Sequence, residues 1–130
     1  MFDISHVPVR DALSQPFWDA ARAHRLLIQR CPTTGAYQWY GRAHSLSDPA
    51  VAPEWVPASG QATLFSYTVI YRGGVQKTPY ACVLVELEEG PLMLARCPQT
   101  QDLRIGMPMA VDFVPLADDL VLPVFLPKEA

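Results

Sequence analysis

The stretch QATLFSYTVIYR, from Gln61 to Arg72, decides the fold class of this chain. Its side chains fall into two alternating sets, which are Leu64, Ser66, Thr68 and Ile70 in one and Phe65, Tyr67, Val69 and Tyr71 in the other. A period of two in β-branched and aromatic residues is typical of a strand with two different faces. The stretch therefore predicts a long β-strand that begins at Gln61.

Four further strands are predicted downstream of this one. They are expected at Tyr80 to Leu87, Leu92 to Cys97, Met109 to Val114 and Leu120 to Phe125. Turn-forming residues separate them, with Gly73-Gly74 before the second strand and Glu88-Glu89-Gly90-Pro91 before the third. Short strands at regular intervals favour a small five-stranded barrel or sandwich over residues 61–130.

Residues 1–60 have a different pattern. Pro8 to His24 is predicted to be helical in two pieces, with Ser14 as a cap and Pro16 near the start of the second piece. The second piece carries an apolar face at i, i+3, i+4 and i+7, made by Phe17, Ala20, Ala21 and His24. Turn formers dominate from Gly35 to Gly60. We therefore expect N-terminal helices and an irregular loop region before the barrel, all in one compact unit.

The composition excludes several classes of function. The 130 residues suffice for one core, and the formal charge of −3 disfavours a nucleic-acid partner, whose phosphates require clustered cations. No apolar run is long enough to span a bilayer, and the first residues do not resemble a secretion signal. Three cysteines are too few and too odd in number for a disulfide framework. The sequence predicts a cytoplasmic protein without a membrane or nucleic-acid partner.

The loop after the predicted helices begins like half of a zinc site. The run Cys31-Pro32-Thr33-Thr34-Gly35 resembles the start of a C-x-x-C metal loop, but Thr34 occupies the position of the second thiolate. The residues alone leave open whether this is a metal site, the remains of one, or an ordinary turn.

The order of several segments resembles the DUF35 family along nearly the whole chain. These segments are FWDAARAHRLLIQRC, EWVPASGQATLFSYTVIYR, TPYACVLVELEEG, RIGMPMAVDF and the closing LPVFLP. The resemblance implies an N-terminal helix and a rubredoxin-like zinc ribbon within residues 1–60, followed by an OB-fold barrel over residues 61–130.

The resemblance also suggests an answer for the loop. Laid on the family's ribbon, the four ligand positions fall at Cys31, Thr34, Ser45 and Asp48. Structural zinc needs four ligands, usually Cys or His, so hydroxyl groups are poor replacements, and the use of His44 would still give only three uneven ligands. We expect that the ribbon has lost its zinc and that packing of aromatic side chains replaces the metal. The candidates for this packing are Tyr37, Trp39, Tyr40 and Trp55.

The sequence shows no convincing nucleophile with a base, pair of catalytic carboxylates or phosphate-binding loop. His6, His24 and His44 all lie in the first third of the chain, where a lone histidine is more often a surface or helix residue than a base. Cys82 lies inside a predicted strand and Cys97 at the end of one, where buried, inert thiols are the simpler interpretation. The function is therefore expected to come from binding surfaces.

The DUF35 resemblance implies a role as an accessory subunit. Members are found with thiolase-like enzymes, steroid side-chain aldolases and MaoC-type enoyl-CoA hydratases. The implied partners are such an enzyme subunit and an acyl-CoA thioester, with no catalysis by the chain alone. A free-standing acyl-CoA or small-lipid binding module is the alternative, and an oligonucleotide-binding OB-fold is disfavoured by the negative charge.

Six residues are candidates for the CoA and acyl contacts. They are Trp18, Arg22, Arg25, Phe65, Tyr67 and Arg72. The arginines would bind phosphates, for which guanidinium forks are well suited. Phe65, Tyr67 and Tyr71 would form an aromatic face that either receives the ligand or, as the stronger expectation, receives the helix through Phe17 and Trp18.

The C-terminal segment VLPVFLPKEA is unusually apolar. Val121, Val124, Phe125 and Leu126 cannot all face a barrel interior on a period of two. The segment therefore either lies partly against another chain or completes the barrel as its last strand.

Overall fold

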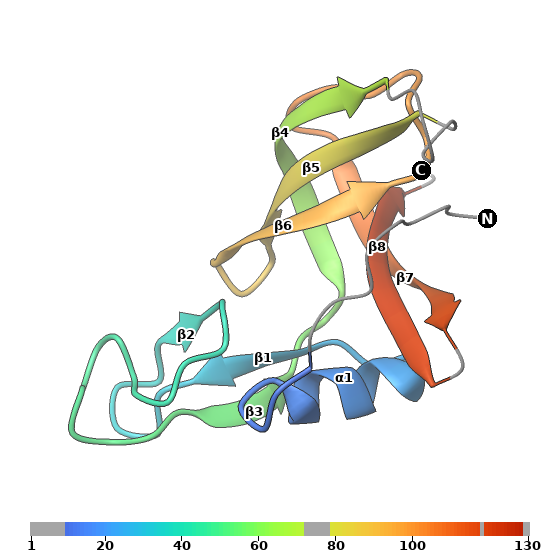
Figure 1. The fold of residues 1–130 in the computed structure, drawn as a ribbon. Coiled ribbons are helices and arrows are strands. Elements are labelled where there is room, and N and C mark those ends of the chain that lie inside the picture. Colours follow the sequence, from blue (N-terminus) through green and yellow to red (C-terminus); the bar gives the residue numbers. More distant parts are fainter. Residues whose placement is uncertain (1–9, 72–78, 118, 129–130) are drawn as a thin grey trace.

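The computed structural model describes residues 10–71, 79–117 and 119–128. Within them lie one helix, α1 (Gln15–Arg22), and two antiparallel sheets (Figure 1). The first sheet contains β1 (Leu27–Arg30), β2 (Tyr37–Gln38) and β3 (Glu54–Pro57). The second contains β4 (Gln61–Ile70), β5 (Tyr80–Leu87), β6 (Leu92–Cys97), β7 (Pro108–Ala117) and β8 (Leu120–Pro127). The predicted mainly β class is confirmed.

The five-stranded sheet has the order β6-β5-β4-β7-β8, so all five predicted strands are present. The predicted five-stranded barrel is present, but it is not fully closed, because β6 and β8 approach each other without a ladder of hydrogen bonds between them. Pro123 lies within β8 and has no N–H group, and proline inside a sheet is confined to edge strands. The second sheet is therefore a barrel with one open seam, between β6 and β8.

The prediction of two helical pieces between Pro8 and His24 was wrong within the described residues, where α1 is the one helix. Before it, the Ser14 N–H donates to the Asp11 carboxylate at 2.8 Å and the Asp11 N–H donates to Ser14 Oγ at 3.2 Å. This reciprocal pair of bonds fixes a turn that ends at Ser14, so the helix begins only after it. Part of the first predicted piece lies in residues 1–9, outside the described residues.

Residues 35–60 are largely irregular, as expected, but two short strands within them pair with β1 in a three-stranded sheet of the order β2-β1-β3. β1 is central and pairs with β2 through Gln29 and Gln38, and with β3 from Leu27 to Arg30. Strands of two to four residues are too short to show a period of two. We call this sheet and the loops that it carries, residues 27–57, the ribbon.

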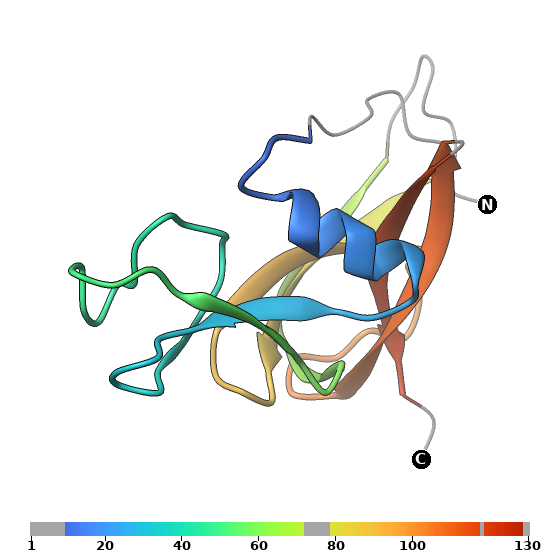
Figure 2. The same ribbon diagram turned by 90° about the horizontal axis from the view of Figure 1, so that it is seen from below.

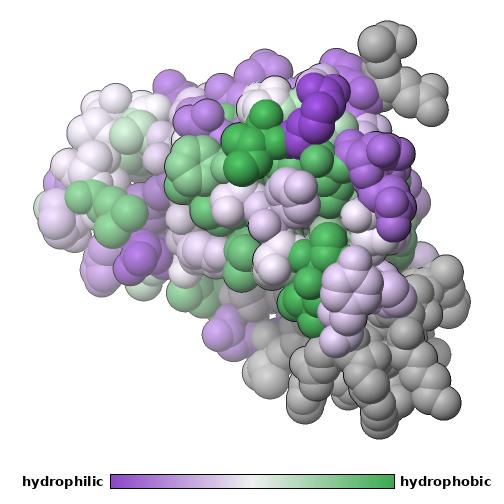
Figure 3. All heavy atoms as spheres, turned by 90° about the horizontal axis from the view of Figure 1, so that it is seen from above, coloured by the Kyte–Doolittle hydropathy of each residue, from purple (hydrophilic) through white to green (hydrophobic). Residues whose placement is uncertain are grey.

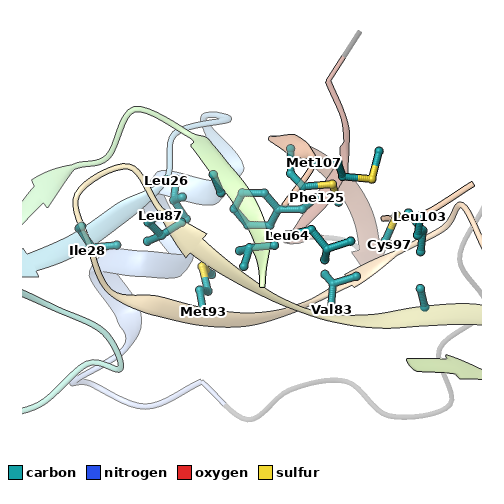
Figure 4. Close-up of a cluster of buried hydrophobic side chains, with 14 of the residues drawn as sticks. Leu26, Ile28, Leu64, Val83, Leu87, Met93, Cys97, Leu103, Met107 and Phe125 are labelled. Atoms are coloured by element: carbon teal, nitrogen blue, oxygen red, sulfur yellow. The ribbon is translucent and has the colours of Figure 1, made fainter. Parts of the chain in front are cut away.

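One hydrophobic core joins the ribbon to the barrel. Figure 4 shows Phe125 in the middle of the cluster, with Leu26 and Ile28 toward the ribbon and Cys97 and Leu103 at the opposite end. Phe125 and Ile28 are both fully buried. Burial of a large apolar side chain contributes roughly 1.5–3 kcal/mol, so the ribbon and the barrel are expected to unfold together.

Helix α1 does not pack on the predicted aromatic face of β4. It lies against β8 and β1 instead (Figures 1 and 2). Val124 and Phe125 are consecutive residues of β8 and both are fully buried, which requires that both faces of this strand are covered. The apolar C-terminal segment is therefore the last strand of the sheet, and α1 provides its second cover.

A β-bulge explains why the aromatic face predicted for β4 does not exist as one surface. Leu64 pairs with Val85 and Ser66 pairs with Leu84, which leaves Phe65 as the extra residue. The extra residue reverses the alternation, so Tyr67 lies opposite the buried Val83 and shares the face of Leu64. Phe65 and Tyr67 therefore do not form a common platform.

Tyr67 contributes to stability through its hydroxyl group, which donates a hydrogen bond to the Leu103 carbonyl at 3.2 Å. We expect Tyr67→Phe to lower the free energy of unfolding by about 0.5–1.5 kcal/mol, the usual net value of one hydrogen bond. Urea unfolding measures this change. Tyr71→Phe is the matched control, because Tyr71 is 76% exposed, and equal stability of the two variants would contradict the role of the Tyr67 bond.

Candidate functional site

The open seam of the barrel contains an apolar cavity of about 380 Å³, which we call the seam cavity. Phe17 and Trp18 of α1 and Trp39 of the ribbon line one side of it. Residues 93–96 of β6 and Leu122 and Pro123 of β8 line it at the seam. Tyr80 and Cys82 of β5 complete the lining. The volume falls within the range of small-molecule sites, and the apolar wall with few polar groups is their usual composition.

Each part of the wall follows from local structure. Pro16 lies in the first turn of α1, and the helix buries Phe17 and Trp18. The ring of Phe17 lies 5.0 Å from that of Trp18 and 4.8 Å from that of Trp39, measured between centroids. Because β6 is an edge strand, side chains from both of its faces reach the cavity.

Two nitrogen atoms in this wall are buried donors without an acceptor. Arg96 Nη1 and Trp39 Nε1 have no hydrogen-bond partner within the described residues. The Arg96 guanidinium lies over the ring of Tyr80, with its Cζ atom 4.2 Å from the ring centroid. A buried donor without a partner costs about 1–3 kcal/mol, so both groups favour a ligand that brings an acceptor.

Of the six residues predicted to contact a ligand, only Trp18 lines the seam cavity. Phe65 and Tyr67 lie on β4, which contributes no residue to the cavity, and Arg72 lies outside the described residues. The sequence analysis missed Arg96, Trp39 and Tyr80 as site residues. An arginine within a strand, on the face that also carries Tyr80 and Cys82, was the one available signal.

Arg22 and Arg25 are exposed and do not line the cavity. Arg22 faces the β7–β8 turn, where Arg10 Nη1 lies 3.1 Å from the Asp119 carboxylate. The hydrogen bond from Arg10 and the charge of Arg10 hold the pKa of Asp119 below its usual range, and the charge of Arg22 adds to this effect. The predicted arginine cluster is thus partly neutralised by an acidic group.

The four family ligand positions of the ribbon do not fit a zinc ion. Among the described residues, no group of three His, Cys, Asp or Glu side chains is arranged to hold a metal. The polar groups near Cys31 and Asp48 in this region are the hydroxyls of two threonines and two serines, which are Thr33, Thr34, Ser45 and Ser47. Hydroxyl groups are poor zinc ligands. Aromatic packing does surround Trp39, whose ring centroid lies 5.4 Å from that of Tyr40 and 6.4 Å from that of Trp55.

The cysteines differ in their ionisation. Burial acts to raise the pKa of the Cys31 thiol, but hydrogen bonds from Ser45, Thr33 and Thr34 outweigh it and lower this pKa to about 5. Burial raises the pKa of the Cys97 thiol, as expected for an inert core residue. All three cysteines are free thiols.

Two sequence profiles match this chain. Residues 18–47 match the rubredoxin-like zinc ribbon domain of ChsH2, and residues 55–114 match the C-terminal OB-fold domain of ChsH2. The chain is 34% identical over 106 residues to the 3-oxo-4,17-pregnadiene-20-carboxyl-CoA hydratase alpha subunit of Mycobacterium tuberculosis, a match that covers 78% of this chain and 34% of the relative. It is 29% identical over 130 residues to a probable enoyl-CoA hydratase alpha subunit of Thermomonospora curvata, covering 85% of this chain and 36% of the relative. The chain thus spans about a third of the length of the curated relatives it matches.

Solved structures give the same result for the fold. The chain is similar to a chain of the Ltp2-ChsH2(DUF35) aldolase, with a TM-score of 0.83, 27% identity, and coverage of 93% of this chain and 98% of that one. It also has the fold of a DUF35-family protein of unknown function from Sulfolobus solfataricus, with a TM-score of 0.60, 17% identity, and coverage of 90% and 86%. Because both the ribbon domain and the OB-fold domain of ChsH2, a DUF35 protein, match this chain, the chain belongs to the DUF35 family.

Proposed function

We propose that this chain is a non-catalytic accessory subunit. In this proposal it binds a thiolase-like enzyme, an aldolase or a MaoC-type hydratase and helps to hold the acyl-CoA thioester on which that enzyme acts. The pathway is lipid or steroid side-chain metabolism, and the location is the cytoplasm, where free thiols such as those of Cys31, Cys82 and Cys97 persist.

One observation carries the proposal. The chain matches almost the whole length of the DUF35 chain in the Ltp2-ChsH2(DUF35) aldolase, with a TM-score of 0.83. The named relatives also include hydratase alpha subunits, one of them for a steroid-derived CoA ester. In the part of the chain that the structure describes, no group of three His, Cys, Asp or Glu side chains is arranged to hold a catalytic metal ion.

The seam cavity supports the ligand part of the proposal. Its apolar wall suits an acyl group, and its buried donors suit an acyl oxygen. Arg22 and Arg25 are exposed within three residues of each other and are our candidates for the CoA phosphates. On the face shown in Figure 3, apolar patches are interrupted by hydrophilic ones. The docking of an enzyme is therefore inferred from the relatives.

A free-standing acyl-CoA or small-lipid binding module is the second candidate, favoured by the same cavity. The two functions differ in whether an enzyme is needed. A complex with an enzyme is expected only for the accessory subunit, whereas both candidates allow the isolated chain to bind a ligand.

The test is size-exclusion chromatography with light scattering of the purified chain mixed with thiolase-like enzymes, aldolases and MaoC-type hydratases from its host. We expect co-elution with one of them in a fixed ratio. A chain that remains unbound beside every candidate would remove the accessory role and leave the free-standing module.

A further inference from the structure

The buried polar atoms without a partner in the wall of the seam cavity are all hydrogen-bond donors. The unpartnered atoms in its wall, Arg96 Nη1 and Trp39 Nε1, are donors, and one of them belongs to a charged group. Neither side chain can accept a hydrogen bond. A ligand with an oxygen acceptor would form hydrogen bonds with both atoms, whereas a ligand with a cationic head would be repelled by the positive charge of Arg96.

The remaining residues of the wall determine which size and polarity of ligand the cavity can hold. Phe17, Trp18, Met93 and Leu122 are apolar, and Trp18 and Met93 are almost fully buried. A water molecule occupies about 30 Å³ in the liquid, so the volume of about 380 Å³ has room for roughly ten groups of similar size, such as methylenes. A medium-length acyl chain fits this space.

We propose that the seam cavity binds an apolar acyl group and that Arg96 and Trp39 recognise its acyl oxygen. This inference rests on the proposed function and specifies where the acyl end of the ligand lies. The acyl oxygen belongs either to a free carboxylate or to the carbonyl of a thioester. Arg96 forms the stronger bond with a carboxylate, because charge-assisted hydrogen bonds are about twice as strong as neutral ones.

The position of Arg96 is fixed before the ligand enters. Its guanidinium lies over the Tyr80 ring, and its backbone lies in β6 opposite Cys82 of β5. Trp39 is held by its ring contacts with Phe17, Tyr40 and Trp55. Donors that are already in place lose little conformational freedom when the ligand binds, which favours affinity.

The experiment is a titration of the isolated chain, followed by tryptophan fluorescence, because Trp18 and Trp39 line the cavity. The probes are decanoate, decanoyl-CoA and decyltrimethylammonium. We expect saturable binding of at least one acyl probe and at least tenfold weaker binding of the cationic probe. Tighter binding of decanoate would identify the free acid as the ligand, and tighter binding of decanoyl-CoA would identify the thioester.

Variants locate the site. Arg96→Met keeps an unbranched apolar stem and removes the donors, so we expect acyl binding to weaken about 10- to 100-fold. Trp39→Phe keeps a ring and removes Nε1, which is expected to weaken binding about 2- to 10-fold and remains informative if the first variant does not fold. Arg104→Met is the matched control at an exposed arginine outside the cavity.

Unchanged acyl binding in both cavity variants, equal binding of the cationic probe, or no binding of any probe would overturn this inference. None of these results would remove the accessory role, which is tested by complex formation with an enzyme. Arg96→Met is expected to keep that complex while it loses the acyl ligand, so the two proposals fail separately.

The ribbon carries a second, independent inference about the metal. Thr33 Oγ1 donates to the Asp48 carboxylate at 2.7 Å, and Thr34 Oγ1 lies 2.6 Å from Ser47 Oγ. The Ser45 hydroxyl oxygen accepts the N–H groups of Ser47 and Asp48, both at 3.2 Å. The bonds of Thr33 and Thr34 join the loop of residues 31–36 to the loop of residues 45–48, and the bonds to Ser45 order the second loop. These are the two loops that carry the family's ligand positions.

We infer that this hydroxyl network takes the place of zinc in holding the two loops together. Elemental analysis is expected to find no zinc, and a chelator is expected to leave the melting temperature unchanged. Thr34→Val keeps the shape of the side chain and is expected to lower the melting temperature by about 2–6 °C. Thr63→Val, at an exposed strand position, is the control. Stoichiometric zinc, or a melting temperature that falls with chelator, would overturn the inference.

Discussion

Replacement of Gly60 by alanine is expected to destabilise the protein by about 2–4 kcal/mol. Gly60 joins β3 to β4 with φ +81°, a left-handed conformation that side chains disfavour. A Cβ atom at this position would lie 2.6 Å from Val111 Cγ1 on β7, so the backbone or Val111 must move. The Gly60 carbonyl also accepts the Val111 N–H at 2.9 Å, which holds the two segments together. Chemical denaturation measures the effect.

Gly106→Ala is the matched control for this prediction. Gly106 has φ +92° but nothing lies within 4 Å of the position of its Cβ atom. Both variants lose the conformational freedom of glycine, so the excess cost at Gly60 measures the steric contact. Val111→Ala in the Gly60→Ala background should remove part of that excess. Equal destabilisation at Gly60 and Gly106 would contradict the close approach of the two segments.

Replacement of Gln29 by leucine is expected to have an effect of similar size, about 1.5–4.5 kcal/mol. Gln29 is 1% exposed, and its Nε2 donates to the Arg42 carbonyl at 3.0 Å. Its Oε1 accepts the Arg42 N–H and Gln38 Nε2, both at 2.9 Å. Leucine has a similar volume but satisfies none of these groups. The Arg42 carbonyl, the Arg42 N–H and Gln38 Nε2 would each lose the bond that they make with Gln29, at about 0.5–1.5 kcal/mol per bond.

Thermal and chemical unfolding test this prediction against Gln101→Leu, a glutamine at an exposed position. A double variant with Gln38→Leu removes both members of the pair, and a coupling free energy of about 0.5–3 kcal/mol is expected between them. Equal stability of Gln29→Leu and the control would contradict the stabilising role of the bonds that Gln29 makes with Arg42 and Gln38.

The strands of the barrel were predictable because their signal is local. The alternation in Gln61–Ile70 and Tyr80–Leu87 reports two faces with different surroundings, and this pattern is visible without knowledge of the neighbouring strands. The β-bulge at Phe65 was not predicted, because a bulge depends on the pairing of β4 with β5. As a consequence, Tyr67 was predicted on the face of Phe65, whereas it lies on the face of Leu64.

The candidate site was far less predictable than the strands. The seam cavity exists because β6 and β8 do not pair, which is a property of the whole sheet and not of one segment. Arg96, Trp39 and Trp18 come from three elements that are distant in sequence, so no spacing of residues indicates that they meet. The family resemblance implied a ribbon within residues 1–60, but the individual strands of the ribbon were not predicted, since β2 has only two residues.

The central claim is that this chain works bound to an enzyme of acyl-CoA metabolism. The most direct measurement is a pull-down of the tagged chain from its native host, with identification of the captured proteins by mass spectrometry. The account predicts a thiolase-like enzyme, an aldolase or a MaoC-type hydratase in a stoichiometric ratio to the chain. Recovery of the chain alone, under conditions that preserve other complexes of the host, would contradict it.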